Sequence, residues 1–384
     1  MKKIFIITLA AVAALLAGCN KVEKMTIDTY IIPGSAEDEA KNAEYYANLR
    51  AYKESDHVLS YVYMGRYATL EGASNLYIEY SNLEHRFLAL PDSLDFVNLW
   101  MGAPTDKPHS NFCWFIDGEN GTKVPDYQFD YSPNCYADMQ YCRRVKGTKF
   151  VLHADASHWG QEFQLIDWNE EKQKNDTTKW KLSKNKQDSH EAYAEFLYRK
   201  CLDYNIDGLD FDYEGWGSQQ MDWVVNYLYD NKKMGKPARE DGENNLILIV
   251  DYFGAVPSSN TINKCDYIVR QAYSVQSGLS AWNQLSNSAP DKWILCEQWE
   301  QGSNPVNWEQ GGKKWSDPSK NAKGDALYSM EAYALFCKQG GAKGFGAYYI
   351  DNDYKISFGP YNNYGYLRNA IQAANPAGKT NDEE

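Results

Sequence analysis

Four acidic side chains crowd into one short apolar stretch, "IDGLDFDYEG" at residues 206–215. If this stretch is a β-strand, its side chains alternate between two faces, so Asp210, Asp212 and Glu214 share one face. Asp207 has the opposite parity, and we assign it a structural task near the start of the strand. Carboxylates about 6–7 Å apart on a buried face repel one another when all are charged. The spacing therefore indicates acid–base chemistry, with a proton shared between Asp210 and Asp212.

A calcium-binding loop is the competing interpretation of the same residues. Asp210, Asp212, Glu214 and Gly215 match the start of the D-x-D-x-D-G pattern. The twelfth position of such a loop is a glutamate in calcium-binding proteins, whereas it is Met221 here. The intervening Phe and Tyr also suit a strand better than a loop, so we favour the strand and expect no metal there.

The elements that must position these acids are visible as eight apolar segments of strand length. They are rich in β-branched or aromatic residues and lie at 57–65, 94–102, 149–156, 206–214, 245–254, 266–273, 292–299 and 343–351. Segments that are apolar on both faces are typical of parallel strands covered by helices. Helical patterns lie between several of them, as at 189–205 and 325–341. The alternation predicts an α/β fold, a (β/α)8 TIM barrel, as a single domain with long βα loops. An open doubly wound sheet is the alternative, but no GxGxxG or Walker glycine loop supports it.

The N-terminus has the pattern of a secretory signal, with two lysines, an apolar run and small residues before Cys19. The ending Leu16-Ala17-Gly18-Cys19 resembles a bacterial lipobox, in which the cysteine is lipidated; an ordinary signal peptide is the alternative. We expect a lipoprotein signal peptide at 1–18, a tether at 19–34, the barrel domain at 35–378 and a disordered tail at 379–384. This organisation predicts a lipid-anchored protein of the bacterial cell envelope, at the outer membrane or cell surface, that touches the membrane only through its anchor.

Composition narrows the class of partner. The chain has 384 residues with 52 acidic and 39 basic side chains, which argues against nucleic acid or an anionic membrane surface as a partner. It also has 30 tyrosines and 12 tryptophans, whose apolar faces and polar edges suit sugar rings. The cysteines after Cys19 lack the repeated spacing of a zinc site. We expect a neutral partner, no cofactor and a monomeric protein.

The start of the barrel domain carries a helix signal. Ser35 can cap a helix that runs to about Lys53, with Asp38 as a partner of the capping-box type.

The full stretch Asp207-Gly-Leu-Asp210-Phe-Asp212-Tyr-Glu214 resembles the DxxDxDxE signature of glycoside hydrolase family 18, the chitinases and endo-β-N-acetylglucosaminidases. This resemblance implies retaining hydrolysis in which the 2-acetamido group of the sugar, and no enzyme nucleophile, attacks the anomeric carbon. It implies that Glu214 is the general acid and base, that Asp212 orients the acetamide N–H, and that Asp210 tunes Asp212.

Strand six adds a second point of resemblance. The tripeptide Gln271-Ala-Tyr273 matches the Gln-x-Tyr of the family's endo-β-N-acetylglucosaminidases, where its chitinases more often have Met-x-Tyr. The resemblance implies that Tyr273 bonds the acetamide oxygen and that Gln271 helps to hold the sugar. Strand eight carries Tyr348 where family chitinases usually have a tryptophan beneath the sugar. We therefore expect hydrolysis of the GlcNAc-β1,4-GlcNAc core of N-linked glycans; a chitinase and a catalytically silent glycan-binding barrel are the alternatives.

Two further segments, the loop after strand seven and the end of strand three, each have two interpretations that the sequence leaves open. Long polar loops are expected at 168–188 and 299–324, and the second follows strand seven on the catalytic face. Its tryptophans, Trp299, Trp308 and Trp315, could line a substrate cleft or pin the loop down; we take Trp299 as a substrate-binding candidate. At the end of strand three, the family's glycine-rich SxGG is replaced by a segment that offers His153, Asp155 and His158. A metal pair is one interpretation, but hydrogen-bonding groups are the commoner use of such neighbours.

Overall fold

The computed structural model describes residues 35–65, 86–106, 115–117, 123–125, 131–235, 246–273, 275–279, 290–299, 308–357 and 362–376. The chain divides into two compact units, residues 1–43 and 44–384. The signal peptide, Cys19, the tether and the tail at 379–384 lie outside the described residues and stay predictions. Among the helices that the structure describes, none combines the length and apolarity that a membrane span needs.

The predicted helix at the start of the domain is broken in two. Helix α2 (Ala36–Lys41) begins after Ser35, whose Oγ accepts the Asp38 N–H at 3.1 Å, as expected of a cap. Helix α3 (Ala43–Glu54) follows after Asn42. The side-chain amide of Asn42 donates to the carbonyl of Asp38 at 3.1 Å and to its Oδ1 at 2.8 Å. Asparagine competes in this way with the backbone ladder, which explains the break.

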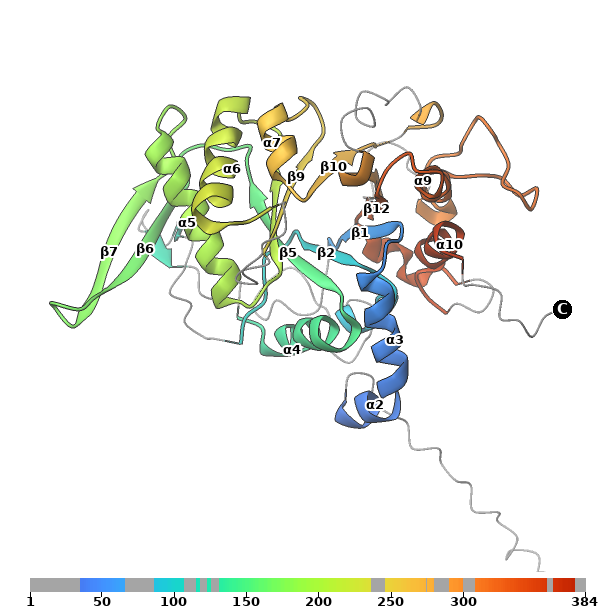
Figure 1. The fold of residues 1–384 in the computed structure, drawn as a ribbon, viewed down its shortest axis with the longest axis horizontal. Helices are drawn as coiled ribbons and strands as arrows, with labels where there is room; N and C mark the ends of the chain where they lie inside the picture. The colour runs from blue at the N-terminus through green and yellow to red at the C-terminus, as the bar shows by residue number, and fades with distance from the viewer. Residues whose placement is uncertain are drawn as a thin grey trace, which may run out of the picture. The chain divides into compact units, whose positions relative to one another are not determined.

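Eight parallel strands close into a barrel (Figure 1): β1 (Leu59–Tyr63), β2 (Phe96–Leu99), β5 (Lys149–Asp155), β8 (Gly208–Asp212), β9 (Ile247–Tyr252), β10 (Tyr267–Gln271), β11 (Trp293–Gln298) and β12 (Gly344–Tyr348). Each strand lies within one of the eight predicted segments. Each pairs with its neighbour in chain order, and β12 closes the barrel on β1 from Leu59↔Gly344 to Tyr63↔Tyr348. The predicted (β/α)8 barrel is confirmed.

Helices lie between strands and cover the outside of the barrel: α4 (Pro133–Tyr141), α5 (Gln187–Asp203), α6 (Ser218–Lys232), α7 (Ser259–Lys264), α9 (Ser329–Lys338) and α10 (Gly365–Ala374). Short helical turns complete the connections at η2 (Phe87–Ala89), η4 (Cys142–Lys146), η6 (Pro290–Lys292), η7 (Trp308–Gln310) and η8 (Ile350–Lys355). Leu209, Phe211 and Tyr213 of the acidic strand lie in the same apolar cluster as Phe196 of α5 and Val224 of α6. The apolar face of this strand therefore packs on helices, as its alternation predicted.

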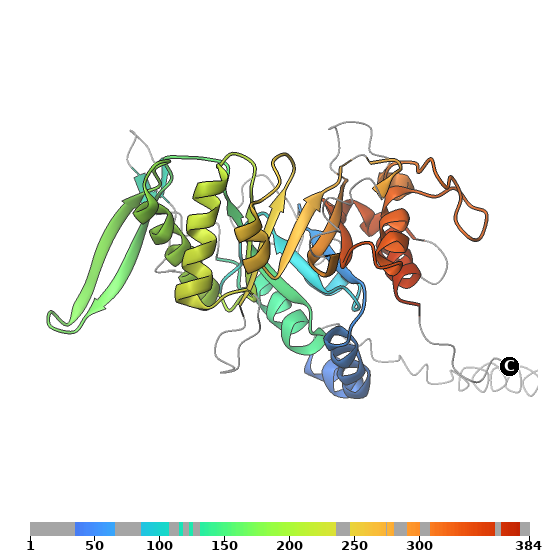
Figure 2. The same cartoon turned by 45° about the horizontal axis from the view of Figure 1, so that its top comes forward.

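The polar segment 168–188, expected as a loop, is in large part a β-hairpin. Strands β6 (Glu162–Asn169) and β7 (Lys174–Lys181) pair antiparallel and extend away from the barrel beside α5 (Figures 1 and 2). At the base of the hairpin, fully buried Phe163 pairs with Trp180. One cross-strand aromatic pair anchors the ribbon, and the other β7 side chains are polar, so the alternation that marks a strand is weak. A second short hairpin pairs β3 (Phe115–Asp117) with β4 (Lys123–Pro125).

A second apolar cluster fills the inside of the barrel, below the acids. It consists of Leu59, Tyr61, Tyr63, Phe96, Val151, Ile249, Val269, Ile294 and Cys296. Strand β12 approaches β1 so closely that a Cβ at Gly346 would overlap the carbonyl oxygen of Tyr61, so glycine is required there. The six cysteines in the described part of the chain are buried free thiols. The interior below the acids is therefore a packed core.

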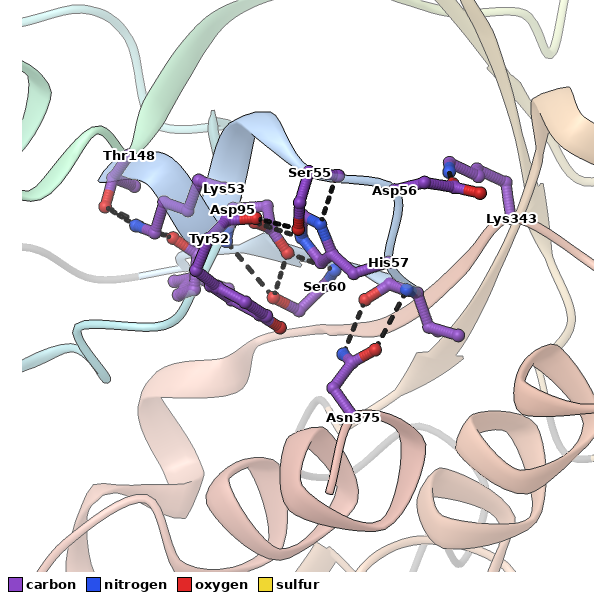
Figure 3. A network of polar contacts seen from close by, with 12 residues as sticks. Tyr52, Lys53, Ser55, Asp56, His57, Ser60, Asp95, Thr148, Lys343 and Asn375 are labelled. Carbon is purple, nitrogen blue, oxygen red and sulfur yellow. Dashed lines mark hydrogen bonds and ion pairs between the residues drawn. The ribbon is translucent and has the colours of Figure 1, made fainter. Parts of the chain in front are cut away.

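A network of polar contacts closes the N-terminal end of the barrel (Figure 3). Asp95, just before β2, accepts the N–H and the hydroxyl of Ser60 through Oδ2, each at 2.8 Å, and its Oδ1 lies 3.0 Å from His57 Nε2. The other ring nitrogen of His57 lies 2.8 Å from the carbonyl oxygen of Ser55. Both nitrogens face acceptors, which favours the protonated form of the ring, in which both nitrogens donate. Burial lowers the pKa of His57, but the hydrogen bond and charge of Asp95 outweigh it and raise the pKa overall.

Candidate active site

The acids of strand β8 are divided as their parity predicted, three toward the inside and one at the start of the strand. Asp210 is fully buried inside the barrel, Asp212 is partly buried above it, and Glu214 is exposed two residues beyond the strand. Their order places Glu214 at the C-terminal end, where TIM-barrel enzymes hold their active sites.

Asp207 has the structural task that its opposite parity indicated. Its two carboxylate oxygens accept from Arg143 Nε and Nη2, each at 2.8 Å, in a bidentate pair. Its Oδ2 also accepts the backbone N–H of Phe150 at 2.8 Å, which links the start of β8 to β5. Asp207 therefore fixes the register of two strands and takes no part in the cavity above.

Asp210 is held by side chains of other barrel strands. Its Oδ2 accepts from Tyr61 Oη at 2.5 Å, Tyr63 Oη at 3.0 Å and Asn98 Nδ2 at 2.7 Å. Burial raises the pKa of Asp210 and these donors lower it, with a net rise. The three donors come from strands one and two, and our prediction from the sequence missed them. The signal was present, because Tyr61 and Tyr63 alternate on one strand face as the acids do.

A fourth interior acid, Asp251 of β9, was also missed. It lies directly opposite Asp212 in the β8–β9 register and is almost fully buried. Gln271 Nε2 donates to both carboxyls, at 2.5 Å to Asp251 Oδ1 and 3.2 Å to Asp212 Oδ1. Burial, followed by the charge of Glu214, raises the pKa of Asp212. Burial, followed by the charges of Asp210 and Asp212, raises the pKa of Asp251 well above its usual range.

These groups open on one cavity of about 190 Å³ at the C-terminal end of the strands, lined by Tyr63, Trp100, His153, Asp212, Glu214, Asp251, Gln271, Tyr273 and Tyr348. The cavity is lined by all the predicted site residues except three. Asp210 lies beneath it, Trp299 is buried elsewhere, and Cys19 is outside the described residues. The volume is below the ~300 Å³ of pockets for drug-sized ligands. The described cavity therefore suits one ring-sized group.

Aromatic rings form one wall of this cavity. Tyr273 and Tyr348 are stacked, with ring centroids 6.4 Å apart and an interplanar angle of 24°. Trp100, which follows β2, packs its edge on Tyr348 at 5.2 Å and 73°. Trp100 was not among the predicted residues. It adds an indole to the wall beside Tyr348 on strand eight.

At the end of the third barrel strand, Asp155 and His158 make hydrogen bonds, which was the favoured interpretation for these residues. Asp155 Oδ2 lies 2.7 Å from His158 Nδ1 and accepts from Gln161 Nε2 at 2.9 Å, while its Oδ1 accepts the Ser157 N–H. Burial raises the pKa of Asp155, but these hydrogen bonds outweigh it and lower the pKa overall. Burial lowers the pKa of His153 to about 4, so this cavity residue is neutral at pH 7. In the described ranges, no three His, Cys, Asp or Glu side chains are grouped as a metal site requires.

The expectation that Trp299 contacts the substrate is wrong. Its side chain is fully buried in the apolar cluster outside the strands, and its ring packs edge-on against Tyr366 at 6.4 Å. Its carbonyl accepts from Asn352 Nδ2 at 2.6 Å, which fixes the backbone at the end of β11. Trp315 is also buried, and the side chain of Trp308 lies outside the described residues. Trp299 and Trp315 therefore pin the segment down, which was the open alternative.

Comparison with known proteins gives both a family match and structural neighbours. The family model of the endo-beta-N-acetylglucosaminidase EndoS TIM-barrel domain matches residues 144–347. No curated protein matches the sequence. Among solved structures, the protein BT1044 aligns with a TM-score of 0.59 and 21% identity, covering 90% of this chain and 98% of that one.

Two further solved structures are similar at lower identity. An endo-beta-N-acetylglucosaminidase from Cordyceps militaris, a mutant in complex with fucosyl-N-acetylglucosamine-Asn, has a TM-score of 0.52 and 18% identity, covering 86% of this chain and 95% of that one. A chitinase from Bacteroides thetaiotaomicron has a TM-score of 0.50 and 13% identity, covering 85% and 100%. At such identities the structures support the fold alone.

Proposed function

This chain belongs to the family of the endo-beta-N-acetylglucosaminidase EndoS TIM-barrel domain, and from this premise we propose that it is a retaining endo-β-N-acetylglucosaminidase. The family match confirms the resemblance to glycoside hydrolase family 18 that the acids of strand β8 indicated. The proposed substrate is the GlcNAc-β1,4-GlcNAc core of N-linked glycans. The observation that carries the proposal is that Glu214 and Asp212 open on the same cavity as Gln271 and Tyr273.

In the proposed reaction, Glu214 gives its proton to the glycosidic oxygen while the acetamide oxygen of the substrate attacks the anomeric carbon. The bond to the leaving sugar breaks, and its electron pair goes to the protonated oxygen. Asp212 accepts the acetamide N–H and stabilises the oxazolinium ion by its negative charge. The Glu214 carboxylate then takes a proton from water, which attacks the same carbon and restores the acetamide. Two displacements at one carbon give overall retention.

The aromatic wall supports a sugar as the ligand. The C–H faces of a hexosamine can pack on the rings of Tyr348 and Trp100. Tyr273, stacked on Tyr348, presents a hydroxyl that we assign to the acetamide oxygen. We assign to Gln271 a contact with the sugar in addition to its hydrogen bonds to Asp212 and Asp251.

Chitin oligosaccharides are the second candidate substrate, because the same chemistry cleaves them. Gln271 at the position of the chitinase methionine, and Tyr348 at that of the chitinase tryptophan, favour N-glycans. A catalytically silent glycan-binding barrel is the third candidate. The presence of Glu214 at the cavity argues against it.

The test compares a denatured N-glycoprotein with chitopentaose and identifies the released products by mass. We expect release from the glycoprotein. Glu214→Gln should lower the rate by about 10²–10⁴-fold, the usual contribution of a general acid, and leave the melting temperature within about 2 °C. Glu171→Gln, an exposed glutamate of the β6–β7 hairpin outside the cavity, is the matched control. Retained release by the Glu214 variant would overturn the proposal, and cleavage of chitopentaose alone would favour the second candidate.

We further propose that the mature protein is lipidated at Cys19 and held at the surface of a bacterial envelope. This rests on the N-terminal sequence pattern. Cys19→Ala should move the expressed protein from the membrane fraction to the soluble fraction. An unchanged membrane fraction would reject the lipid anchor, without bearing on the catalytic proposal.

A further inference from the structure

We propose that Asp251 is a positioning residue that holds the shared proton of the buried acid group, defined as Asp210, Asp212 and Asp251. As a neutral carboxylic acid it donates its one O–H to a neighbouring carboxyl, and because it carries no charge Asp212 can be the anion that faces the substrate. The inference deepens the proposed function and rests on it for the role of Asp212. It moves the shared proton from the Asp210–Asp212 pair, where the sequence placed it, to the neighbouring strand β9.

Two buried oxygens without a donor point to the position of this proton. Asp210 Oδ2 has three donors, so the ionised form of Asp210 is well solvated by the protein. Asp210 Oδ1 and Asp251 Oδ2 are both buried and have no hydrogen-bond partner. The Asp251 carboxyl lies within hydrogen-bonding reach of both Asp210 and Asp212. A proton on Asp251 therefore gives partners to oxygens that are otherwise costly to bury.

The surroundings of Asp251 give a second, independent reason. The titratable groups that face it from the neighbouring strands are Asp210 and Asp212 of β8, Tyr61 and Tyr63 of β1, Tyr273 after β10 and Cys296 of β11. None of these described neighbours is a cation. Three ionised carboxyls in one buried group without a cation would repel strongly, so at least one must keep its proton.

Gln271 fixes which oxygen of Asp251 can carry the proton. Its Nε2 donates at 2.5 Å to Asp251 Oδ1, which leaves Oδ2 for the proton. The same amide donates at 3.2 Å to Asp212 Oδ1. Both contacts favour an ionised carboxyl, but at Asp251 burial and the charges of Asp210 and Asp212 outweigh the contact and raise the pKa. The geometry thus separates the roles: Asp251 holds the proton, Asp210 is the anchored anion, and Asp212 is the anion at the cavity.

Two substitutions at position 251 separate a neutral donor from an anion. Asp251→Asn keeps the shape, one acceptor for Gln271 and a neutral N–H donor, so kcat should fall by less than about tenfold. Asp251→Leu keeps the branched shape but has no donor, and kcat should fall by about 100-fold or more with a smaller change in KM. A fall in Asp251→Asn as large as that in Asp251→Leu would mean that a negative charge is needed, and would overturn the proposal.

The matched control is Asp353→Asn. Asp353 is another fully buried aspartate, and burial raises its pKa to about 8, but it accepts the Tyr366 and Leu367 N–H groups away from the cavity. Its substitution should change stability and leave kcat within about twofold of the wild type. A fall in kcat as large as that of Asp251→Leu would show that replacing any buried aspartate slows the enzyme, and would overturn the specific role of Asp251.

A measurement that needs no activity keeps this inference distinct from the proposed function. The protein is labelled with carbon-13 at aspartate carboxyls, and the signal absent from Asp251→Asn is followed from pH 4 to pH 8. We expect it to keep the chemical shift of a protonated carboxyl at pH 7. A signal that is ionised by pH 5 would overturn the inference. Protonated Asp251 in a protein that cleaves no GlcNAc-containing substrate would sink the proposed function instead.

Discussion

Asp95 at the N-terminal end of the barrel meets a histidine and two donors from Ser60 (Figure 3), whereas Asp212 at the C-terminal end meets other carboxyls. Both aspartates are largely buried in one barrel. At the first end, Asp95 has a histidine and the donors of Ser60 as partners, which stabilises the fold. At the second end, burial and like charges raise the pKa of Asp212 and Asp251. The difference indicates that the C-terminal end gives up stability for chemistry.

The N-terminal end also has a hollow, of about 420 Å³, lined in part by Asp56, His57, Lys343 and Asn375. Size alone does not make it a site. Both ring nitrogens of His57 are occupied. Asn375 uses its side-chain amide to accept the Val58 N–H at 3.0 Å and to donate to its carbonyl at 2.8 Å. These groups are engaged in holding the last helix to the first strand and have little capacity left for a ligand.

The largest loss of stability should come from removing Asp95, which tests whether the N-terminal end stabilises the fold. Asp95→Ala leaves a buried imidazolium and the Ser60 N–H without partners, so the free energy of unfolding should fall by about 3–5 kcal/mol. Activity per folded molecule should not change, because Asp95 is at the opposite end from the cavity. Urea denaturation and a glycan-release assay on the same samples measure the two quantities. Asp95→Asn, which still accepts the Ser60 N–H, is the control and should lose less stability.

The corresponding substitution at the C-terminal end of the barrel is Asp212→Asn. Removing the charge that faces the acetamide should lower the rate by about 10²–10³-fold. The same change removes one of the crowded carboxyls, whose pKa burial raises, so the melting temperature at pH 7 should rise. Thermal melts at pH 7 and glycan-release rates measure these two quantities. A variant that is both slower and less stable would mean that Asp212 supports the fold, and the comparison between the two ends would fail.

The two ends should also differ in the pH window over which stability changes. The raised carboxyl pKa values mean that the folded state keeps protons that the unfolded chain releases above about pH 4. Stability therefore falls as the pH rises from about 4, and Asp251→Asn should melt above the wild type at pH 7 but not at pH 4. The raised pKa of His57 contributes stability below about pH 6.5 that is lost as the pH rises through its folded value. The loss of melting temperature in His57→Gln should accordingly be full at pH 6 and smaller at pH 9.

The sequence was sufficient for features that depend on local pattern. All eight strands lie in the predicted segments, because each is a short apolar run whose length and composition exclude a helix. The structural task of Asp207 followed from side-chain parity alone. Asp251 could have been found as well, since it is the only acid in the apolar run 245–254 and shares the position of Asp212 near a strand end.

The missed features depend on closure of the barrel or on tertiary packing. Asn98 and Tyr61 lie more than a hundred residues before Asp210, and only the ring of eight strands brings them into contact. Trp299 was misjudged because its place after a barrel strand does not show whether the ring turns toward the cavity or the outer core. The hairpin from β6 to β7 was missed because mostly polar strands with one buried aromatic pair have little alternation to detect.

The smallest effect should come from the ion pair beside the N-terminal network. Lys343 Nζ lies 2.6 Å from Asp56 Oδ1, but the Asp56 side chain is 96% exposed, so water screens the pair. The hydrogen bond and charge of Lys343 lower the pKa of Asp56. Asp56→Asn should nevertheless shift the melting temperature by less than about 2 °C in low salt, and by less still in high salt. A shift as large as that of Asp95→Ala, measured in parallel melts, would show that surface charge and not the buried His57–Asp95 pair holds this end of the barrel.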